Sequence, residues 1–253
     1  LKMAKLNEHT DKLACQTCHI PAYGRGKVQT KMSWDWSTAG KLDDKGHRIQ
    51  TKGSQGKTEY DSKKGNFTYD RYVIPEYQWF NGDVKWTTME DTIDPDGVIK
   101  INEYMGSPDD GKSRIWPIRV FRGKQMIDKG NKTLVITNLA GDKDTKFWGN
   151  YDMQKAVESG MKYADKDFSG ELGFAKSEMS WPITHMVAPK EDALSCQQCH
   201  TENGRLEGVE GIYMPATNST PWLDKLGLSI ALLTLIGVLI HGLIRVILHK
   251  RGA

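Results

Sequence analysis

The longest apolar stretch of the chain lies near its C-terminus. Residues 226–244 are 19 positions without a formal charge, and at ~1.5 Å per residue a helix of this length crosses a hydrocarbon core of ~30 Å. Polar residues dominate most of the upstream chain. The pattern predicts one C-terminal transmembrane α-helix, with residues 1–220 outside the bilayer and an anchor with a short tail over residues 221–253.

Periodicity upstream of this helix is weak. Residues 1–22 are a short helix candidate, and residues 23–70, rich in Gly, Lys, Asp and Ser, predict a loop with scattered short strands. Aromatic and β-branched residues recur between turn signals over residues 69–135, which predicts short strands there.

One soluble segment has a clear helical period. Residues 150–165 place Met153, Val157 and Met161 four positions apart, which is typical of an amphipathic helix. Taken together, these patterns predict a loop-rich fold that mixes helices with short strands and has little regular structure.

Composition and charge exclude two classes of protein. The chain has 253 residues, of which 38% are hydrophobic and 26% charged, so a purely disordered chain is excluded. Its 35 Lys and Arg against 32 Asp and Glu give a net charge of +3 without a basic stripe. We therefore expect no nucleic-acid partner.

The four cysteines carry the clearest chemistry. They form two C-x-x-C-H motifs, Cys15-Gln16-Thr17-Cys18-His19 and Cys196-Gln197-Gln198-Cys199-His200. This spacing is that of c-type haem attachment, in which two thiols form thioethers to one porphyrin and the following histidine ligates iron from the proximal side. The sequence thus predicts two covalently bound haems c.

Other uses of the cysteines fit less well. Zinc ribbons keep their cysteine pairs about 15 to 20 residues apart, whereas these pairs lie near opposite ends of the polar region, and neither zinc, a dithiol centre nor two disulfides explains a histidine after each pair. Haem c attachment occurs outside the cytoplasm. Because the chain begins at Leu1 without the pattern of a signal peptide, we expect the export signal to lie upstream or to have been removed.

A low-spin haem iron needs a sixth ligand, usually a second His or a Met. His185, close before the second motif in WPITHMVAPKEDALSCQQCH, is the best candidate, and His9, six residues before Cys15, is the next. The alternative for His185 is a core histidine. His47 lies in a charged stretch and is expected to be solvated, and Met186 is expected to be a packing residue.

Aspartates cluster in two turn-like runs, DPDG and SPDDG, over residues 94–97 and 107–111. Carboxylates of this kind hold Ca²⁺ in some proteins, but neither run is an EF-hand loop. Turn chemistry explains them better, and a calcium site is kept only as the lesser alternative.

Several blocks of the chain carry a family resemblance: LACQTCHIP, TKMSWDWSTAG, IPEYQWFNGDV, GSPDDGKSRIWPIRVFRGKQ, FWGNYDMQKAVESGM and SEMSWPITHMVAPKEDALSCQQCHTENGRL. In this order they resemble the C-terminal part of octahaem c-type cytochromes of the tetrathionate reductase family, over about residues 8–207. That family is distantly similar to hydroxylamine oxidoreductases and pentahaem nitrite reductases. The resemblance implies closely packed haems in a mostly helical, loop-rich fold, and reduction of small sulfur or nitrogen compounds at one special haem.

The resemblance also assigns residues. The matching positions are Cys15, Cys18 and His19 in one haem motif, Cys196, Cys199 and His200 in the last motif, and His185 and His9 as expected distal ligands. Six other haem motifs of the family, including the region expected to hold the special haem, have no counterpart here. No catalytic residue is therefore assigned, and the remaining haems are expected on another multihaem chain or on a missing N-terminal part.

The membrane helix departs from that family. Arg245, His249, Lys250 and Arg251 crowd its far side, and Lys and Arg mark the cytoplasmic end of a membrane helix. We expect a single crossing of the cytoplasmic membrane, with the C-terminus in the cytoplasm and the haem-bearing part on the periplasmic side.

His241 and Arg245 lie one turn apart on the predicted membrane helix. Ionisable residues at membrane depth are costly and indicate function. One hypothesis is that His241 ligates a haem b shared with a partner membrane cytochrome b, or contacts quinone, with Arg245 near a propionate or a headgroup. The alternative is that both side chains snorkel to the cytoplasmic interface.

These observations predict a membrane-anchored c-type cytochrome that passes electrons between the quinone pool and an octahaem-type redox core. Reduction of tetrathionate, nitrogen oxyanions or hydroxylamine would belong to the whole assembly. One alternative is a complete reductase with a five-coordinate, substrate-binding haem in this chain. Another is a haem wire without a substrate.

Overall fold

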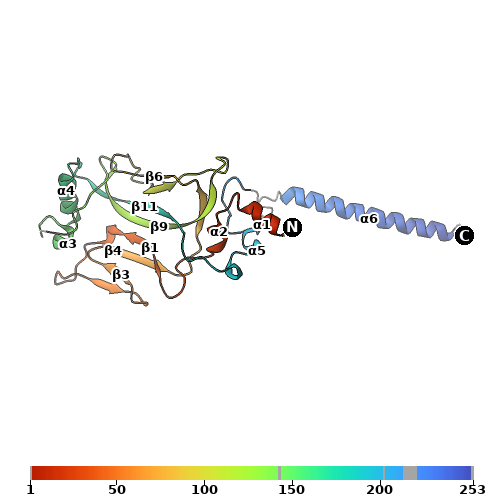
Figure 1. Ribbon diagram of the computed structural model, residues 1–253, viewed down its shortest axis with the longest axis horizontal. Coiled ribbons are helices and arrows are strands. Elements are labelled where there is room, and N and C mark those ends of the chain that lie inside the picture. Colours follow the sequence, from red (N-terminus) through yellow and green to blue (C-terminus); the bar gives the residue numbers. More distant parts are fainter. Residues whose placement is uncertain (1, 142–143, 202, 213–220, 252–253) are drawn as a thin grey trace. The chain divides into compact units, whose positions relative to one another are not determined.

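The computed structural model of the chain describes residues 2–141, 144–201, 203–212 and 221–251 (Figure 1). It divides into two compact units, one of Leu1–Ser195 with Val209–Gly211 and one of Cys196–Gly208 with Ile212–Ala253. The predicted division after residue 220 borders residues 213–220, which lie outside the described residues. That division stays a prediction.

The described elements follow one another along the chain. The helices are α1 (Lys2–His9), α2 (Cys15–His19), η1 (Trp36–Thr38), α3 (Phe147–Asn150), α4 (Met153–Tyr163), η2 (Lys190–Asp192), α5 (Cys196–Cys199) and α6 (Pro221–Arg251). The strands are β1 (Thr30–Asp35), β2 (Gln50–Lys52), β3 (Thr58–Asp61), β4 (Gly65–Asp70), β5 (Glu76–Phe80), β6 (Val84–Trp86), β7 (Val98–Lys100), β8 (Asn102–Tyr104), β9 (Arg114–Asp128), β10 (Thr133–Leu134) and β11 (Leu172–Pro182).

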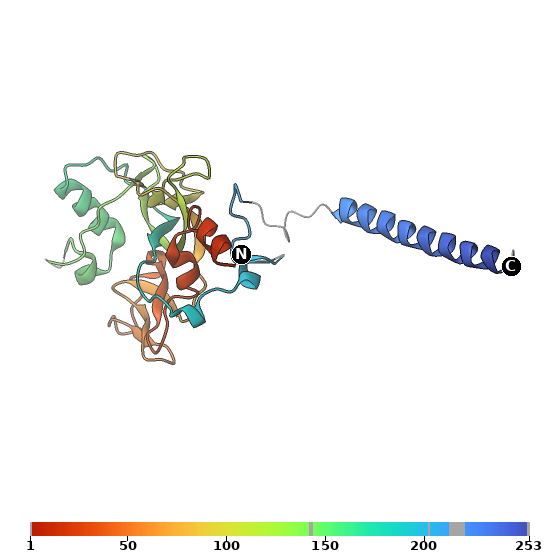
Figure 2. The same ribbon diagram turned by 45° about the vertical axis from the view of Figure 1, so that its right-hand side comes forward.

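A nine-stranded sheet forms the described part of the first unit. Its strands neighbour one another in the order β2-β3-β4-β1-β9-β11-β7, and β5 and β10 also pair with β9. Strands β6 and β8 form a separate antiparallel pair. In both views α1 and α2 lie at one end of the sheet, and α3 and α4 lie at the other (Figures 1 and 2).

Strand β9 is the centre of this sheet. It is 15 residues long and pairs with β11 in an antiparallel register that runs from Leu172 opposite Asp128 to Pro182 opposite Ile118. Ile118 is 1% exposed, and Ile127 is also 1% exposed in a buried cluster beneath β11 and β7. The apolar side chains of β9 therefore supply much of the core against which the other elements pack.

The expectation of little regular structure is wrong. Residues 23–70, predicted as a loop, contain β1 to β4, and β9 and β11 are long strands rather than short ones. Strand β1 is half-buried at every position, so it has no alternation of apolar and polar residues to indicate a strand. Backbone pairing with β4 and β9 holds it instead, and backbone groups are the same in every residue.

The N-terminal helix candidate is divided in two. Helix α1 ends at His9, and α2 begins at Cys15. Between them Leu13 makes a parallel bridge with Ile115 of β9. This long-range contact takes the backbone groups that a continuous helix would use.

The amphipathic helix predicted over residues 150–165 is confirmed as α4. Asp152 caps its start by accepting a hydrogen bond from Lys155 N at 3.1 Å. Val157 is fully buried and Met161 is 2% exposed, so the residues of the predicted apolar stripe do face the core.

Helix α6 is the predicted apolar C-terminal helix. Its span Trp222–His249 has 28 residues with a mean hydropathy of 2.4, and none of it is buried against the protein. By length and composition this helix can cross a membrane.

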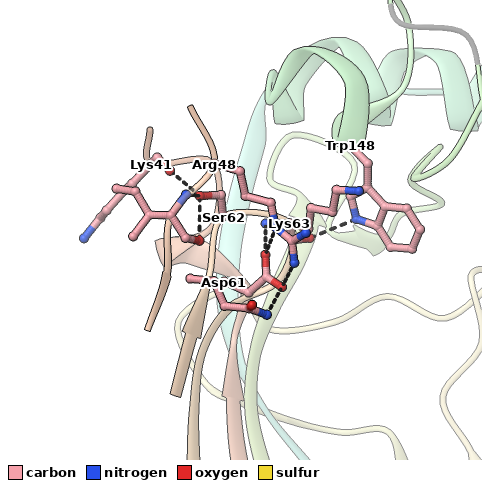
Figure 3. A network of polar contacts seen from close by, with 8 residues as sticks. Lys41, Arg48, Asp61, Ser62, Lys63 and Trp148 are labelled. Carbon is pink, nitrogen blue, oxygen red and sulfur yellow. Dashed lines mark hydrogen bonds and ion pairs between the residues drawn. The ribbon is translucent and has the colours of Figure 1, made fainter. Parts of the chain in front are cut away.

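A buried carboxylate organises the edge of the sheet near α3 (Figure 3). Asp61, 4% exposed, accepts hydrogen bonds from Arg48 Nε and from Lys63 N, each at 2.9 Å, and pairs with Arg48 Nη2 as well. Trp148 Nε1 of α3 donates to Lys63 O over 2.9 Å. Burial raises the pKa of Asp61, but the Arg48 guanidinium and the Lys63 N–H outweigh it and hold that pKa below its ordinary value.

We expect Asp61→Asn to lower the free energy of unfolding by about 1–3 kcal/mol at neutral pH, because the amide leaves the donors of Arg48 without a charged acceptor. The depressed pKa of Asp61 means that its stabilisation is complete above the ordinary Asp pKa of about 3.9 and is lost as the pH falls through the lower folded value. Urea titration from pH 7 to pH 3 should therefore show the difference shrinking below about pH 4. The exposed Asp44→Asn is the matched control, and equal stability of the two variants at pH 7 would contradict this prediction.

Candidate haem-attachment sites

The first C-x-x-C-H motif forms helix α2 and is fixed to β9 at one residue. Ala14 N donates to Ile115 O over 3.0 Å, and Ile115 N donates to Lys12 O over 2.8 Å. Thr17, fully buried between the two cysteines, adds a hydrogen bond from its Oγ1 to the same Ile115 O at 2.6 Å. The central strand of the sheet thus sets the position of the motif.

Both thiols of this motif lie on one side of α2. Residues three positions apart share a helix face, so Cys15 and Cys18 lie together while Thr17 turns toward the sheet. Cys15 is exposed and Cys18 is half-buried. This arrangement suits two bonds to one flat group laid beside the helix.

A backbone carbonyl orients the ring of His19. Nδ1 of His19 lies 3.3 Å from Ala188 O, and because a carbonyl oxygen only accepts, Nδ1 carries the proton in this contact. Ala188 N in turn donates to His19 O over 2.7 Å. Nε2 is then the unprotonated nitrogen of the neutral ring, which is the form and the outer contact of a histidine that ligates a metal.

Arg25 holds the segment that brings Ala188 to this ring. Its Nη1 donates to Met186 O over 3.4 Å, and its Nη2 lies 4.0 Å from Asp192 Oδ2. These contacts lie on either side of Ala188 along the chain. Arg25 therefore connects the two flanks of the segment that orients His19.

The second motif repeats the local geometry within the second unit. Helix α5 spans Cys196–Cys199, and His200 N donates to Cys196 O over 2.9 Å. Cys196 is exposed and Cys199 is half-buried, as in the first motif. The same residue types at the same spacing give this motif the same chemical capacity.

The predicted distal ligands have exposed side chains. His9 is the last residue of α1, and His185 lies three residues before Ala188. Their axial roles stay predictions. His47 is exposed and lies 3.3 Å from Asp43 Oδ2 through its Nδ1.

His241 and Arg245 lie on α6, four residues apart and therefore on one face, and both side chains are exposed. Their role toward a haem b or quinone stays a prediction.

The aspartates of the two turn-like runs cap their own turns. The Ser113 hydroxyl, followed by the backbone N–H groups of Lys112 and Ser113, holds the pKa of Asp110 below its ordinary value. Asp91 accepts hydrogen bonds from Thr88 N and Thr88 Oγ1 at 2.7 and 2.8 Å. Among the described residues no group of three or more His, Cys, Asp or Glu is arranged to hold a metal ion, so turn chemistry accounts for these carboxylates.

Sequence reasoning missed the residues that support the first motif. Within C-x-x-C-H the position of Thr17 is only a spacer, and Ala188 contributes through its backbone alone. No local pattern indicates either contact, because each joins positions about 100 or more residues apart in the chain.

Comparisons with known proteins agree on the class of protein. Residues 31–203 match the family described as Cytochrome c bacterial. The solved structure of an octahaem cytochrome c from Shewanella oneidensis is 37% identical with a TM-score of 0.74, and the match covers 85% of this chain and 48% of that one. The chain thus spans about half the length of that structure. No curated protein matches it.

We expect Thr17→Val to lower the free energy of unfolding by about 1–2 kcal/mol, because the substitution keeps the shape but removes a buried hydrogen bond to Ile115 O. Guanidinium titration of the purified protein measures the change. Thr10→Val is the matched control, since the exposed Thr10 hydroxyl bonds only to the nearby Asn7 O. A Thr17 variant as stable as the Thr10 variant would argue against this anchoring contact.

Proposed function

The chain belongs to the bacterial cytochrome c family, and we propose that it is a membrane-anchored electron carrier between the quinone pool and an octahaem-type redox core. Its class, a multihaem c-type cytochrome, follows from the family match and the octahaem similarity together. The observation that carries the proposal is the arrangement of α2, in which two thiols share a helix face beside a histidine whose Nδ1 meets a carbonyl oxygen.

The residues of the first motif fit a covalently bound haem. Cys15 and Cys18 supply the thiols for two thioether bonds, and His19 presents Nε2 because Ala188 O occupies Nδ1. The buried Thr17 keeps the helix in place during attachment. The second motif offers the same groups at Cys196–Cys199, so we propose two haems c on this chain.

When bound, haem c supplies an iron that accepts and releases single electrons. The protein sets the reduction potential at each site through the axial ligands, the burial of the site and the charges nearby. Ala188 contributes to this setting, because a carbonyl that accepts from Nδ1 makes the His19 ring a stronger donor. The proposed role requires no acid or base from this chain.

The chain matches about half of the octahaem structure, so we propose that the remaining haems of the redox core lie outside residues 1–253. They would be on another multihaem cytochrome c chain or on an N-terminal part. We propose membership of the tetrathionate reductase branch, with reduction of tetrathionate, nitrogen oxyanions or hydroxylamine as the activity of the whole assembly.

The composition and hydrogen bonding of α6 support a single-pass anchor. The span Trp222–His249 is ~42 Å long at ~1.5 Å per residue, against a hydrocarbon core of ~30 Å. Ser229 Oγ donates to Lys225 O and Thr234 Oγ1 to Ile230 O, each over 2.8 Å. Both hydroxyls are thereby satisfied within the helix, as a lipid environment requires.

We propose that the C-terminal end of α6 faces the cytoplasm, since Arg245, Lys250 and Arg251 follow its apolar stretch. His241 lies ~8 Å from the centre of the apolar span and Arg245 ~14 Å from it, so His241 is within the hydrocarbon core and Arg245 at its border. A parallel second copy would place Arg245 against Arg245. Like-charge repulsion therefore favours a different partner, a membrane cytochrome b whose haem or quinone site receives His241.

A haem inventory of the native protein tests the carrier role. We expect pyridine haemochrome analysis and intact mass to give two haems c on this chain, with further haems c on a co-purifying chain. Replacing Cys15 and Cys18 together by Ala should remove one haem, and replacing Cys196 and Cys199 together should remove the other. His47→Ala, away from both motifs, should keep both haems. Full haem content after either double substitution would contradict the attachment sites.

We expect His241→Leu to abolish reduction of the haems by quinol in membranes, with the haem c content unchanged, because the substitution removes the imidazole from the apolar span. Stopped-flow reduction by a quinol analogue measures the rate. His249→Leu, at the end of the span, is the matched control. Unchanged quinol reduction in the His241 variant would assign this residue to the interface instead.

A further inference from the structure

The segment between β11 and the second motif, residues 183–194, is pinned to the first motif at two points. Ala188 N donates to His19 O over 2.7 Å, and Leu194 N donates to Cys18 O over 2.9 Å. These backbone contacts hold the segment against α2 on the side of the His19 backbone.

The contact at Nδ1 places this segment behind the His19 ring. Ala188 O lies 3.3 Å from Nδ1, so an iron ligated by Nε2 would lie on the other side of the imidazole. The porphyrin plane would then separate the segment from the distal face of the same haem. A distal ligand for that haem must approach from beyond the plane.

His185 is too close to Ala188 along the chain to reach that face. Three residues span at most ~11 Å when fully extended, and here Met186 turns the chain in the left-handed conformation with φ of 64°. Arg25 holds the turn through Met186 O. On the other side Ile183, 3% exposed, is fixed in a buried cluster.

The surface around His185 is apolar. The His185 side chain is exposed, and the next two residues, Met186 and Val187, are 39% and 59% exposed. Neighbouring exposed apolar side chains mark a contact surface. A porphyrin has the wide apolar face and the iron that together match this combination of side chains.

We propose that His185 is the distal ligand of a haem other than the one attached at Cys15 and Cys18. This inference rests on the proposed function and says which haem of the assembly the residue serves. Residues 183–194 then join two redox centres, because the Ala188 carbonyl orients the proximal ligand of one haem and His185 ligates the next.

The first test is His185→Ala in the complete, haem-loaded protein. We expect one haem to change from low-spin to high-spin in the electron paramagnetic resonance spectrum, and added imidazole to restore the low-spin signal, because imidazole replaces the missing ligand. His47→Ala, an exposed histidine of the same unit, is the matched control and should leave all spin states unchanged. If the haem spectra of the His185 variant match the wild type, the proposal is wrong.

The second test separates the two haems. In a chain that lacks the first haem through Cys15→Ala and Cys18→Ala, adding His185→Ala should still convert one haem to high-spin. If His185 served the removed haem, the further substitution would add no high-spin signal, and the proposal would be overturned.

A variant with both ligands changed covers the case in which the cysteine variant does not fold. His19→Met combined with His185→Ala should alter the spectra of two haems, whereas ligands of a single iron would alter only one. Failure of the proposed function is distinguished by mass, because it removes covalent haem altogether. Failure of this inference leaves both haems attached and His185 spectroscopically silent.

Discussion

Ile115 is the residue through which the sheet holds the first haem motif. It is fully buried in β9, its N–H donates to Lys12 O, and its carbonyl accepts from Ala14 N and from Thr17 Oγ1. A carbonyl oxygen has two lone pairs, and both are used here. Because a slip of one residue would turn Ile115 to the opposite face of the strand, the register of β9 decides whether the two thiols lie where they do.

The same strand determines the position of the proximal histidine. β9 pairs with β11 up to Pro182, and the segment that follows β11 carries the Ala188 carbonyl to His19 Nδ1. Ile20, directly after His19, packs with Ile183 in one buried cluster. The thiol helix and the carbonyl that orients its histidine are therefore both placed by β9, one from each side of a single sheet.

Backbone pairing carries much of the stability of this unit. Strand β1 is half-buried throughout but is paired on both sides, and Asp61 fixes the outer strands through charge-assisted hydrogen bonds. α6, in contrast, satisfies its backbone and hydroxyl groups within itself. This difference suits a sheet that works in water and a helix that works in lipid.

The chemistry of the attachment sites, the apolar helix α6 and the amphipathic helix α4 could all be predicted from the sequence alone, because each depends on residue types at short, fixed spacing. That residues 23–70 form strands and that Ala188 faces His19 became evident only in the folded chain. Those features depend on backbone N–H and C=O groups, which nearly every residue carries and no pattern distinguishes. Their partners lie far away along the chain, so they are selected by the register of β9 and β11 and not by any local motif.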